Sequence, residues 1–557
     1  MTKSILKIFL EKGFLLDKEM LDFLSELKDE EIANEIINKI AIISKQKLIT
    51  KNLVNQNIEK LRPIFFDLDN EKKKLIERFF VNVSISVEVH KETIYEPVVE
   101  NKKEIGNPPV KVISSPIVSS KKLEVKDFVR HFRNRFVFLR SLLQQKTDLE
   151  NLTSIDKIGG NHRNFSIIGI VTSKSVTKNK NIILEVEDLT DKIKLLINHS
   201  KEDIFEKAKE ILLDDVIGFK CSGTKEFLFA NDIFYPDCFL KEKHRSEKEC
   251  YAIFTSDIHV GSVNFLEKNF EKFIDWLNGI GCDEKQKEIL KKIRYLFIIG
   301  DNIDGVGIYP GQEKFITIKD MKEQYNILAK YLKKIPSYIS IIMCPGQHDG
   351  VRVAEPQPPI GEDFGEALHS IPNLYLVSNP SMVEIENTNG RAGIKVLMYH
   401  GASMHPIINE IEELRLINAH QYPARVVKHL LLRRHLAPTH GEMVYIPDEN
   451  EDSMLIKEIP DIVATGDLHK SDIDKYNGIL IISNSCWQSI TPFEEKVGNK
   501  PDPCKVPVLN LQTGAIKIID FSDAPEEINC EEKDNDGDNG SLENKNIVCE
   551  VKDVKNS

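Results

Sequence analysis

The chain has 557 residues, of which 41% are hydrophobic and 29% charged, and a formal net charge of -12. That length exceeds one domain, and the balance is ordinary for a soluble protein. No run of about 18 or more apolar residues is present and the first residues include no small-residue cleavage site, so we expect a cytoplasmic protein without a membrane span. Because phosphate neutralisation needs a basic surface, the negative charge argues against a protein that holds nucleic acid by itself.

The nine cysteines are scattered along the chain, and none forms a CxxC pair. This spacing argues against a disulfide framework and a zinc ribbon. We expect reduced cysteines, with Cys344 and Cys486 filling the core rather than acting as nucleophiles.

Four segments at the two ends of the chain differ in periodicity. Apolar residues recur at helical spacing through residues 1–80, which predicts a small helical domain that we interpret as a partner-docking module. Residues 81–122 contain alternating valines, scattered prolines and lysines and no helical period, as is typical of a flexible linker, and residues 123–160 return to helical spacing as a connector. Residues 523–557 are acidic and poor in hydrophobic residues, which predicts a disordered tail.

Residues 161–245 contain five short runs rich in β-branched and aromatic residues, with one helical stretch between the third and the fourth. This order of strands and helix is that of an OB fold. OB folds can bind single-stranded nucleic acid through stacking aromatics. Here Phe227, Phe229, Phe234 and Tyr235 alternate mostly as core residues do, so we expect a scaffold instead.

Five polar segments within residues 246–522 each follow a buried-strand pattern of β-branched or aromatic residues. They are, in chain order, DIHVGS, GDNIDG, PGQHDG, YHGAS and GDLHKS. Side chains at the carboxyl ends of neighbouring strands meet at one edge of a sheet, where open α/β folds place their sites. One such segment alone is more often a cap, but five in succession predict a shared crevice that holds metal ions.

Carboxylates, imidazoles and one amide in these segments form a candidate two-metal site. Two divalent ions about 3.5 to 4 Å apart need a bridging carboxylate, and Asp301 is the natural bridge. His348, left without a metal, is placed to donate a proton to a leaving oxygen. The other ligands form two sets, namely Asp257, His259 and His469 for one ion and Gln347, His400 and Asp467 for the other.

Basic residues near these segments are candidates for contacts with phosphate groups. Arg352 closely follows PGQHDG. A helix-like segment, QYPARVVKHLLLRRHLAP, adds Arg425, Lys428, Arg433 and Arg434. A plain surface helix would show the same pattern, and this alternative stays open. His405 and His440 lie outside the motif positions, so we interpret both as structural.

The five segments, which read DxH, GDxxDG, PGxHD, a strand ending in HG, and GDxH in this chain, resemble the motifs of the calcineurin-like metallophosphoesterase superfamily. Three longer stretches, VRVAEPQPP, LRRHLAPTHG and SCWQSITPFEEKVGNKPDPCKVPVLNLQTG, are similar to the small subunit of archaeal family-D DNA polymerase. The resemblance implies an α/β multidomain protein with a calcineurin-like two-sheet phosphoesterase sandwich flanked by helices over residues 246–522. The OB fold and the helical N-terminal domain precede this sandwich.

In that family the small subunit is a 3'-5' proofreading exonuclease, so the resemblance implies a phosphodiester hydrolase within a DNA-directed DNA polymerase. It implies a large catalytic subunit as the partner in a heterodimer or heterotetramer. The implied substrate is DNA with single-stranded or frayed 3' ends, a sliding clamp is a further candidate partner, and no membrane is involved. The implied cofactors are two divalent metal ions, with manganese expected and magnesium as the alternative.

Two positions depart from the superfamily pattern. Gln347 stands where the pattern has asparagine, which places the amide about 1.5 Å further from the backbone. Asp467 stands where the pattern has histidine, and a carboxylate favours harder ions such as manganese or magnesium. Three other functions are alternatives: a catalytically weak or inactive scaffold like the non-catalytic subunits of eukaryotic replicative polymerases, a stand-alone double-strand-break repair nuclease, and a phosphatase.

Overall fold

A computed structural model describes residues 15–16, 48–49, 109–117, 122–160, 162–387, 392–448 and 450–522. The chain divides into two compact units, residues 1–98 and residues 99–557. In the first unit, strand β1 (Leu15–Leu16) pairs in parallel with β2 (Leu48–Ile49). The rest of the predicted helical domain, and all of the acidic tail, lie outside the described residues.

Residues 162–234 of the second unit form a closed five-stranded barrel. Its strands are β4 (His162–Val176), β5 (Ile182–Glu187), β6 (Lys192–Ile197), β7 (Val216–Thr224) and β8 (Phe227–Phe234), in the order β4-β5-β6-β8-β7. Helix α8 (Glu202–Lys209) lies between β6 and β7 in the chain. Alternate residues of β5 and β6 point into the barrel core. This is the OB-fold order, so that prediction is confirmed.

Helix α7 (Val125–Leu143) links the barrel to the domain that follows it. A capping box between Glu124 and Asp127 fixes its first turn. One apolar face packs on the barrel, where Phe136 and Leu139 share a cluster with residues of β4 and β7. Arg135 on another face donates from Nε to Asp452 Oδ2 at 2.7 Å. The helix is therefore anchored on both neighbours.

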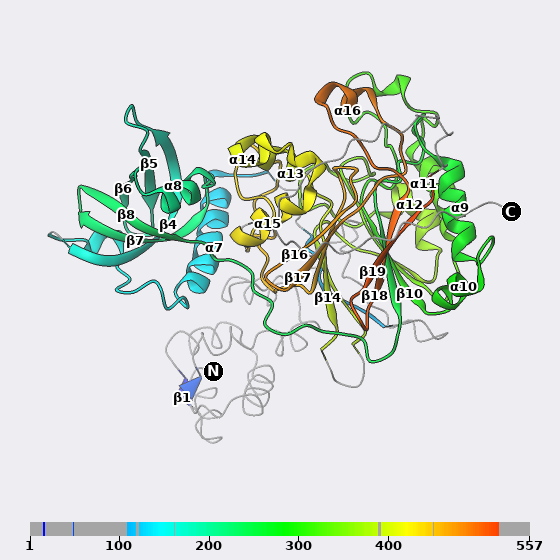
Figure 1. Ribbon diagram of the computed structural model, residues 1–557, viewed down its shortest axis with the longest axis horizontal. Helices are drawn as coiled ribbons and strands as arrows, with labels where there is room; N and C mark the ends of the chain where they lie inside the picture. Colours follow the sequence, from blue (N-terminus) through cyan, green and yellow to red (C-terminus); the bar gives the residue numbers. More distant parts are fainter. Residues whose placement is uncertain are drawn as a thin grey trace, which may run out of the picture. The chain divides into compact units, whose positions relative to one another are not determined.

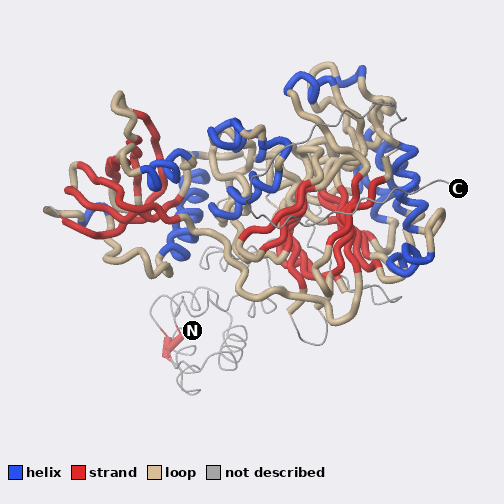
Figure 2. Tube along the Cα trace, viewed as in Figure 1, coloured by secondary structure: helices blue, strands red, loops and turns tan. Residues whose placement is uncertain are grey.

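The remaining domain consists of two six-stranded sheets, drawn red at the centre of Figure 2. The first has the order β12-β11-β10-β9-β18-β19 and contains β9 (Tyr251–Thr255), β10 (Ile293–Ile299), β11 (Ser340–Cys344), β12 (Leu374–Leu376), β18 (Lys505–Asn510) and β19 (Ile516–Asp520). The second has the order β16-β17-β15-β14-β13-β3 and contains β3 (Val110–Ser114), β13 (Ser381–Ile385), β14 (Ile394–Met398), β15 (Ile462–Thr465), β16 (Asp472–Tyr476) and β17 (Ile479–Ser483). One shared core lies between the sheets.

Helices cover the two sheets (Figure 1). The core that includes residues of the first sheet also contains residues of α9 (Glu267–Leu277), α10 (Glu284–Leu290), α11 (Met321–Leu332) and α12 (Glu362–His369). The core that includes residues of the second sheet contains residues of α13 (Met404–Glu410), α14 (Glu412–Leu416) and α15 (Pro423–Arg433). A short helix, α16 (Pro492–Val497), follows the last motif segment. The predicted calcineurin-like fold, a two-sheet sandwich with flanking helices, is confirmed.

Strand β3 lies within residues 81–122, which the sequence predicted to be a flexible linker. It pairs in antiparallel register with β13, so Val112 lies opposite Val383. Val110 and Val112 pack against the core between the sheets, whereas Lys111 pairs with Glu384 at 3.2 Å. Over residues 110–114 the linker prediction is therefore corrected to an edge strand. Within the described residues, no helix is long and apolar enough to cross a membrane.

Candidate metal centre

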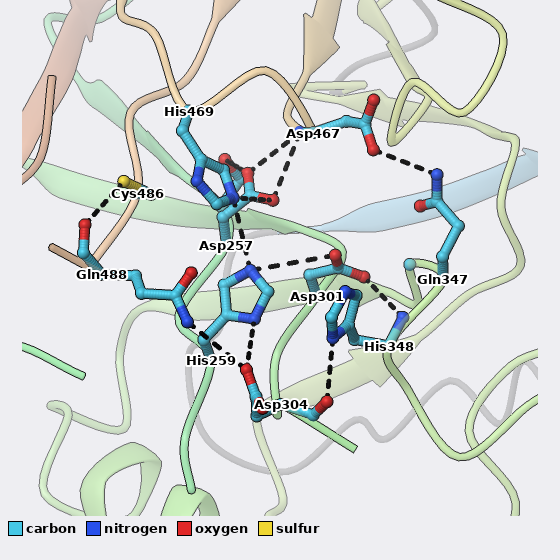
Figure 3. A network of polar contacts seen from close by, with 12 residues as sticks. Asp257, His259, Asp301, Asp304, Gln347, His348, Asp467, His469, Cys486 and Gln488 are labelled. Carbon is cyan, nitrogen blue, oxygen red and sulfur yellow. Dashed lines mark hydrogen bonds and ion pairs between the residues drawn. The ribbon is translucent and has the colours of Figure 1, made fainter. Parts of the chain in front are cut away.

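The five polar segments follow strands whose carboxyl ends meet at one edge of the sandwich. Strands β9, β10 and β11 run parallel in the first sheet, and β14 and β15 run parallel in the second. The side chains predicted as ligands come shortly after each of these strands ends. The topology thus brings residues from positions 257 to 469 into one site, as Figure 3 shows.

The backbone is left-handed at several of the predicted ligands. The φ angles are 51° at Asp257, 53° at His259, 46° at Asp301, 67° at Asp467 and 54° at His469. Non-glycine residues seldom adopt this conformation, and it persists where the surrounding structure enforces it. Backbone strain of this kind is common at functional sites, so the left-handed turns support a functional role for these loops.

Asp257, His259 and His469 come together as the sequence predicted for the first ion. Nε2 of His469 lies 3.3 Å from Nε2 of His259 and 3.4 Å from Oδ1 of Asp257. Two atoms that each bind one ion at about 2.1 Å, at an angle of about 100°, lie roughly 3.2 Å apart. All three side chains are buried. Their spacing fits a shared cation.

Asp301 and His400 form the centre of the second set. Nε2 of His400 lies 3.3 Å from Oδ2 of Asp301 and 3.8 Å from Oδ1 of Asp467. Nε2 of Gln347 donates to the same Oδ1 of Asp467 at 3.0 Å. Within the part of the chain that the structure describes, Nε2 of His400 and Oε1 of Gln347 are buried without a hydrogen bond. Buried acceptors left open in this way fit a bound cation.

Asp301 touches both sets, as a bridging ligand must. Its Oδ2 lies 3.3 Å from His400 Nε2 and 3.9 Å from His259 Nε2, and its Oδ1 accepts from the backbone N–H of His348 at 2.9 Å. Burial alone would raise the pKa of Asp301, but the neighbouring His400 and His348 hold that pKa well below its usual range. The group is therefore an ionised carboxylate.

Each imidazole in the site is oriented through its second nitrogen. Nδ1 of His259 lies 3.2 Å from Oδ1 of Asp304, and Nδ1 of His469 lies 3.0 Å from Oε1 of Glu494 (Figure 3 labels Asp304). Nδ1 of His400 donates to the carbonyl oxygen of Ile299 at 2.8 Å. Such outer partners fix the tautomer and direct Nε2 toward a metal.

The sequence prediction missed both carboxylates that orient the histidines. Asp304 is the second aspartate of GDNIDG, so the motif contained a signal for it. Glu494 belongs to a capping box with Thr491 at the start of α16. That box predicts a helix start, but nothing in the local pattern brings it to His469.

A buried carboxyl group, Asp349, joins two of the ligand loops. It accepts from the N–H of Gly346 at 2.9 Å, from the N–H of Asn302 at 3.2 Å and from the hydroxyl of Tyr325 at 2.8 Å. Burial, reinforced by Asp301, raises the pKa of Asp349 to about 6. Gly346 is required here, because a Cβ at that position would lie 2.2 Å from Oδ1 of Asp301.

His348 lies beside the first set of ligands. Its ring centroid is 4.9 Å from that of His259 in an edge-on arrangement, and its Nδ1 lies 2.8 Å from the carbonyl oxygen of Asp304. The Asp304 carbonyl can only accept, so Nδ1 of His348 is the donor. The ring is thereby held at the edge of the cluster.

The predicted phosphate contacts of Arg433 and Arg434 are contradicted by their burial. Arg433 is 3% exposed and donates from Nε to Asp215 Oδ1 at 3.0 Å. Arg434 is 5% exposed and donates to the carbonyl oxygens of Ile456 and Lys457 at 2.8 and 2.7 Å. Arg433 links α15 to the chain just before β7, and Arg434 links it to the chain at Ile456 and Lys457. We therefore interpret both residues as structural.

The other three basic candidates differ in exposure. Arg425 is exposed, and its guanidinium carbon lies 5.6 Å from the ring centroid of Tyr422. Lys428 is half-buried and forms an ion pair with Asp474. Arg352 is half-buried and donates from Nε to the carbonyl oxygen of Pro356 at 3.0 Å. Contacts of these three residues with DNA remain a prediction.

His405 and His440, which the sequence led us to interpret as structural, lie in different surroundings. His440 is exposed and packs edge-on against the rings of Phe128 and Tyr445, each with centroids 5.3 Å away. His405 instead has its Nε2 3.6 Å from Oδ2 of Asp467. One of the two therefore lies next to a predicted ligand.

The fold is a calcineurin-like two-sheet sandwich preceded by an OB fold, and comparisons with known proteins identify the family. The sequence model that describes the B subunits of DNA polymerase alpha/epsilon matches residues 252–473. The DNA polymerase II small subunit of Methanothermobacter thermautotrophicus is 36% identical over 399 residues, which cover 72% of this chain and 80% of that protein.

Two further relatives carry the same name. The protein of Archaeoglobus fulgidus is 31% identical over 510 residues, which cover 91% of this chain and 95% of that protein. The protein of Pyrococcus horikoshii is 37% identical over 404 residues, but the match covers only 63% of its length and 72% of this chain. The chain belongs to the family of DNA polymerase II small subunits.

Proposed function

We propose that this protein is a two-metal 3'-5' exonuclease that removes nucleotides from DNA ends during replication. The observation that supports this most is the convergence of Asp257, Asp301 and His400 in one buried cluster. Within it Nε2 of His400, and next to it Oε1 of Gln347, are buried with no hydrogen bond among the described residues. Carboxylate and imidazole ligands suit manganese, with magnesium as the alternative. The harder donor set created by Asp467 supports the same choice.

Chemically, two divalent ions held by these residues would polarise a phosphodiester and acidify an attacking water. The chain's own groups perform the remaining tasks. Asp304 and Glu494 hold His259 and His469 in position, and Asp301 spans both sets of ligands. His348, held through Nδ1, presents its other nitrogen as the proton donor for the departing 3' oxygen. A crevice ringed by loops admits a single strand or a frayed 3' end more readily than an intact duplex.

The partner of this protein follows from the name of its relatives. A polymerase small subunit implies a large catalytic subunit, in a heterodimer or heterotetramer. The net charge of -12 supports this, because a partner then supplies much of the positive charge that holds DNA phosphates. A sliding clamp is a further proposed partner.

The substitution of Asp467 for the histidine of the superfamily pattern favours a second candidate, a catalytically weak or inactive scaffold subunit. The amide of Gln347 donates to Oδ1 of this carboxylate at 3.0 Å, so that oxygen already accepts a hydrogen bond and would have to exchange it for a metal ion. Retention of the other ligand side chains supports the enzyme over the scaffold.

A nuclease assay decides between the two. The full-length chain, with and without the large subunit, is incubated with manganese and a 5'-labelled primer, single-stranded or in a blunt duplex. We expect stepwise shortening from the 3' end, faster on the single strand, and loss of shortening in His400→Ala. His199→Ala, which removes an exposed histidine of the barrel, is the matched control. Absence of cleavage by the wild type in both settings would favour the scaffold.

A further inference from the structure

His405 lies on the first turn of α13, just after the YHGAS segment that contributes His400. Its side chain is 37% exposed, and its Nε2 lies 3.6 Å from Oδ2 of Asp467. Asp467 itself is largely buried, with 12% of its side chain exposed. The imidazole of His405 therefore borders the predicted ligand on the solvent side.

The two oxygens of Asp467 have different surroundings. Oδ1 accepts from Gln347 at 3.0 Å and lies 3.8 Å from Nε2 of His400. Oδ2 is buried, and among the described residues it accepts no hydrogen bond. A buried carboxylate oxygen without a donor is costly, and a small rotation of His405 would bring its Nε2–H within hydrogen-bond distance.

A second histidine orients His405. Nδ1 of His405 lies 3.2 Å from Nε2 of His420, which belongs to the 3-10 turn η3 (Ala419–Gln421). When Nε2–H of His420 donates to that Nδ1, the proton of His405 resides on Nε2 and points toward Asp467. The arrangement is that of an outer partner holding a metal ligand, as Asp304 and Glu494 do for His259 and His469.

We propose that His405, backed by His420, is a positioning residue that fixes Asp467 as a ligand of the second metal ion. The ordinary pattern at this position is a histidine that binds directly. In this chain Asp467 occupies that position, and the imidazole of His405 lies next to its carboxylate as an outer partner. This inference rests on the proposed two-metal site.

A double-mutant cycle on manganese binding tests the proposal. The full-length wild type, His405→Ala, Asp467→His and the double variant are titrated with manganese, and both the number of bound ions and their affinities are measured by calorimetry and electron paramagnetic resonance. We expect His405→Ala to weaken one of the two ions about tenfold or more, as loss of an outer partner typically does. In the Asp467→His background the same change should have little effect, because no carboxylate then needs His405.

Further variants make the outcome specific. His405→Gln, whose amide N–H can replace Nε2–H, should restore most of the affinity, and His420→Ala should weaken the same ion to a smaller extent. His199→Ala and the melting temperature without metal serve as controls for the fold. The inference alone would be overturned if His405→Ala lowered the manganese affinity equally in the wild-type and Asp467→His backgrounds. It would also be overturned if His405→Ala bound two ions with wild-type affinity. A wild type that binds no manganese would overturn the proposed function together with it.

Discussion

Two buried clusters of charged residues in this molecule are built on opposite principles. At the candidate metal centre, Oε1 of Gln347 and Nε2 of His400 are buried and lack hydrogen bonds among the described residues. In the cluster between α7 and the sandwich, Asp452 receives Arg135 at 2.7 Å and His435 at 2.8 Å. The first cluster, the open cluster, therefore presents acceptors that suit a cation, whereas in the second, the closed cluster, the charged groups pair with one another.

Backbone geometry separates the two clusters in the same way. Five predicted ligands have φ between 46° and 67°, whereas Asp452, Arg135 and His435 are not among the residues with positive φ. Strained turns persist where function requires them, and a structural ion network has no need of them. Buried charge alone is therefore a poor sign of a site, but buried charge with open acceptors and left-handed turns is a better one.

Removal of the bridging carboxylate should have the largest effect. Asp301→Asn keeps the volume of the side chain but removes the charge shared by both sets of ligands. We expect manganese-dependent cleavage to fall by more than about 100-fold, because a direct ligand should matter more than an outer partner. The assay on labelled primer measures this. A melting temperature in EDTA close to that of the wild type is required, since collapse of the fold would remove the distinction between the clusters.

The closed cluster should respond in stability rather than in activity. Arg135→Met leaves Asp452 as a buried charge whose neighbouring ionisable side chains are histidines, and removal of one partner from a buried pair costs about 3 to 5 kcal/mol. Urea unfolding measures the loss, and Arg133→Ala on the exposed face of α7 should change stability by no more than about 0.5 kcal/mol. If Arg135→Met were as stable as the wild type but inactive, the roles assigned to the clusters would be reversed.

The sequence predicted the fold, and it predicted most of the residues that meet in the candidate metal centre, because the relevant signals are local. Buried strands show as runs of β-branched residues, and each ligand lies a few residues beyond such a run. The pattern could not show partners that are distant in the chain. Glu494 meets His469 through a helix cap, and β3 pairs with a strand more than 250 residues away.

Helix α15 shows a second case in which the sequence could not reveal a contact between residues that are distant in the chain. Its sequence has the composition of a phosphate-binding surface, but Arg433 is buried because Asp215, which lies just before β7, reaches it. Whether a cation on a helix faces solvent depends on what packs there, and that is set by tertiary structure. The interpretation of His405 as structural depended on motif position alone and could not register its distance from Asp467.

The closed cluster should also make stability depend on pH. Burial lowers the pKa of His131 to about 4, although Asp452 opposes this shift. The unfolded chain, in which a histidine has a pKa of about 6.5, binds a proton between those values that the folded protein does not bind. Stability should therefore be fully present above pH 6.5 and fall as the pH drops toward 4, by about 3 kcal/mol from this group.

Urea unfolding at pH 7 and pH 5 measures this dependence. His131→Gln should flatten the slope without removing it, since burial also lowers the pKa of His435 and His429. Asp452 affects stability at lower pH than His131 does. Burial would raise the pKa of Asp452, but the neighbouring His435 and Arg135 hold that pKa well below its usual range. Its contribution is present above about pH 4 and disappears as the pH falls further. A slope unchanged in His131→Gln would contradict the assignment.

Manganese should stabilise the folded protein only by binding at the open cluster. This is the smallest of the expected effects, but it distinguishes the two clusters directly. A ligand that binds the folded state alone, at 100 times its dissociation constant, adds about 2.7 kcal/mol. The wild type and Arg135→Met should therefore both melt at a higher temperature with manganese than with EDTA, whereas Asp301→Asn should show a reduced shift or none. Equal shifts in all three proteins would mean that the metal binds elsewhere, and the open acceptors would then need another explanation.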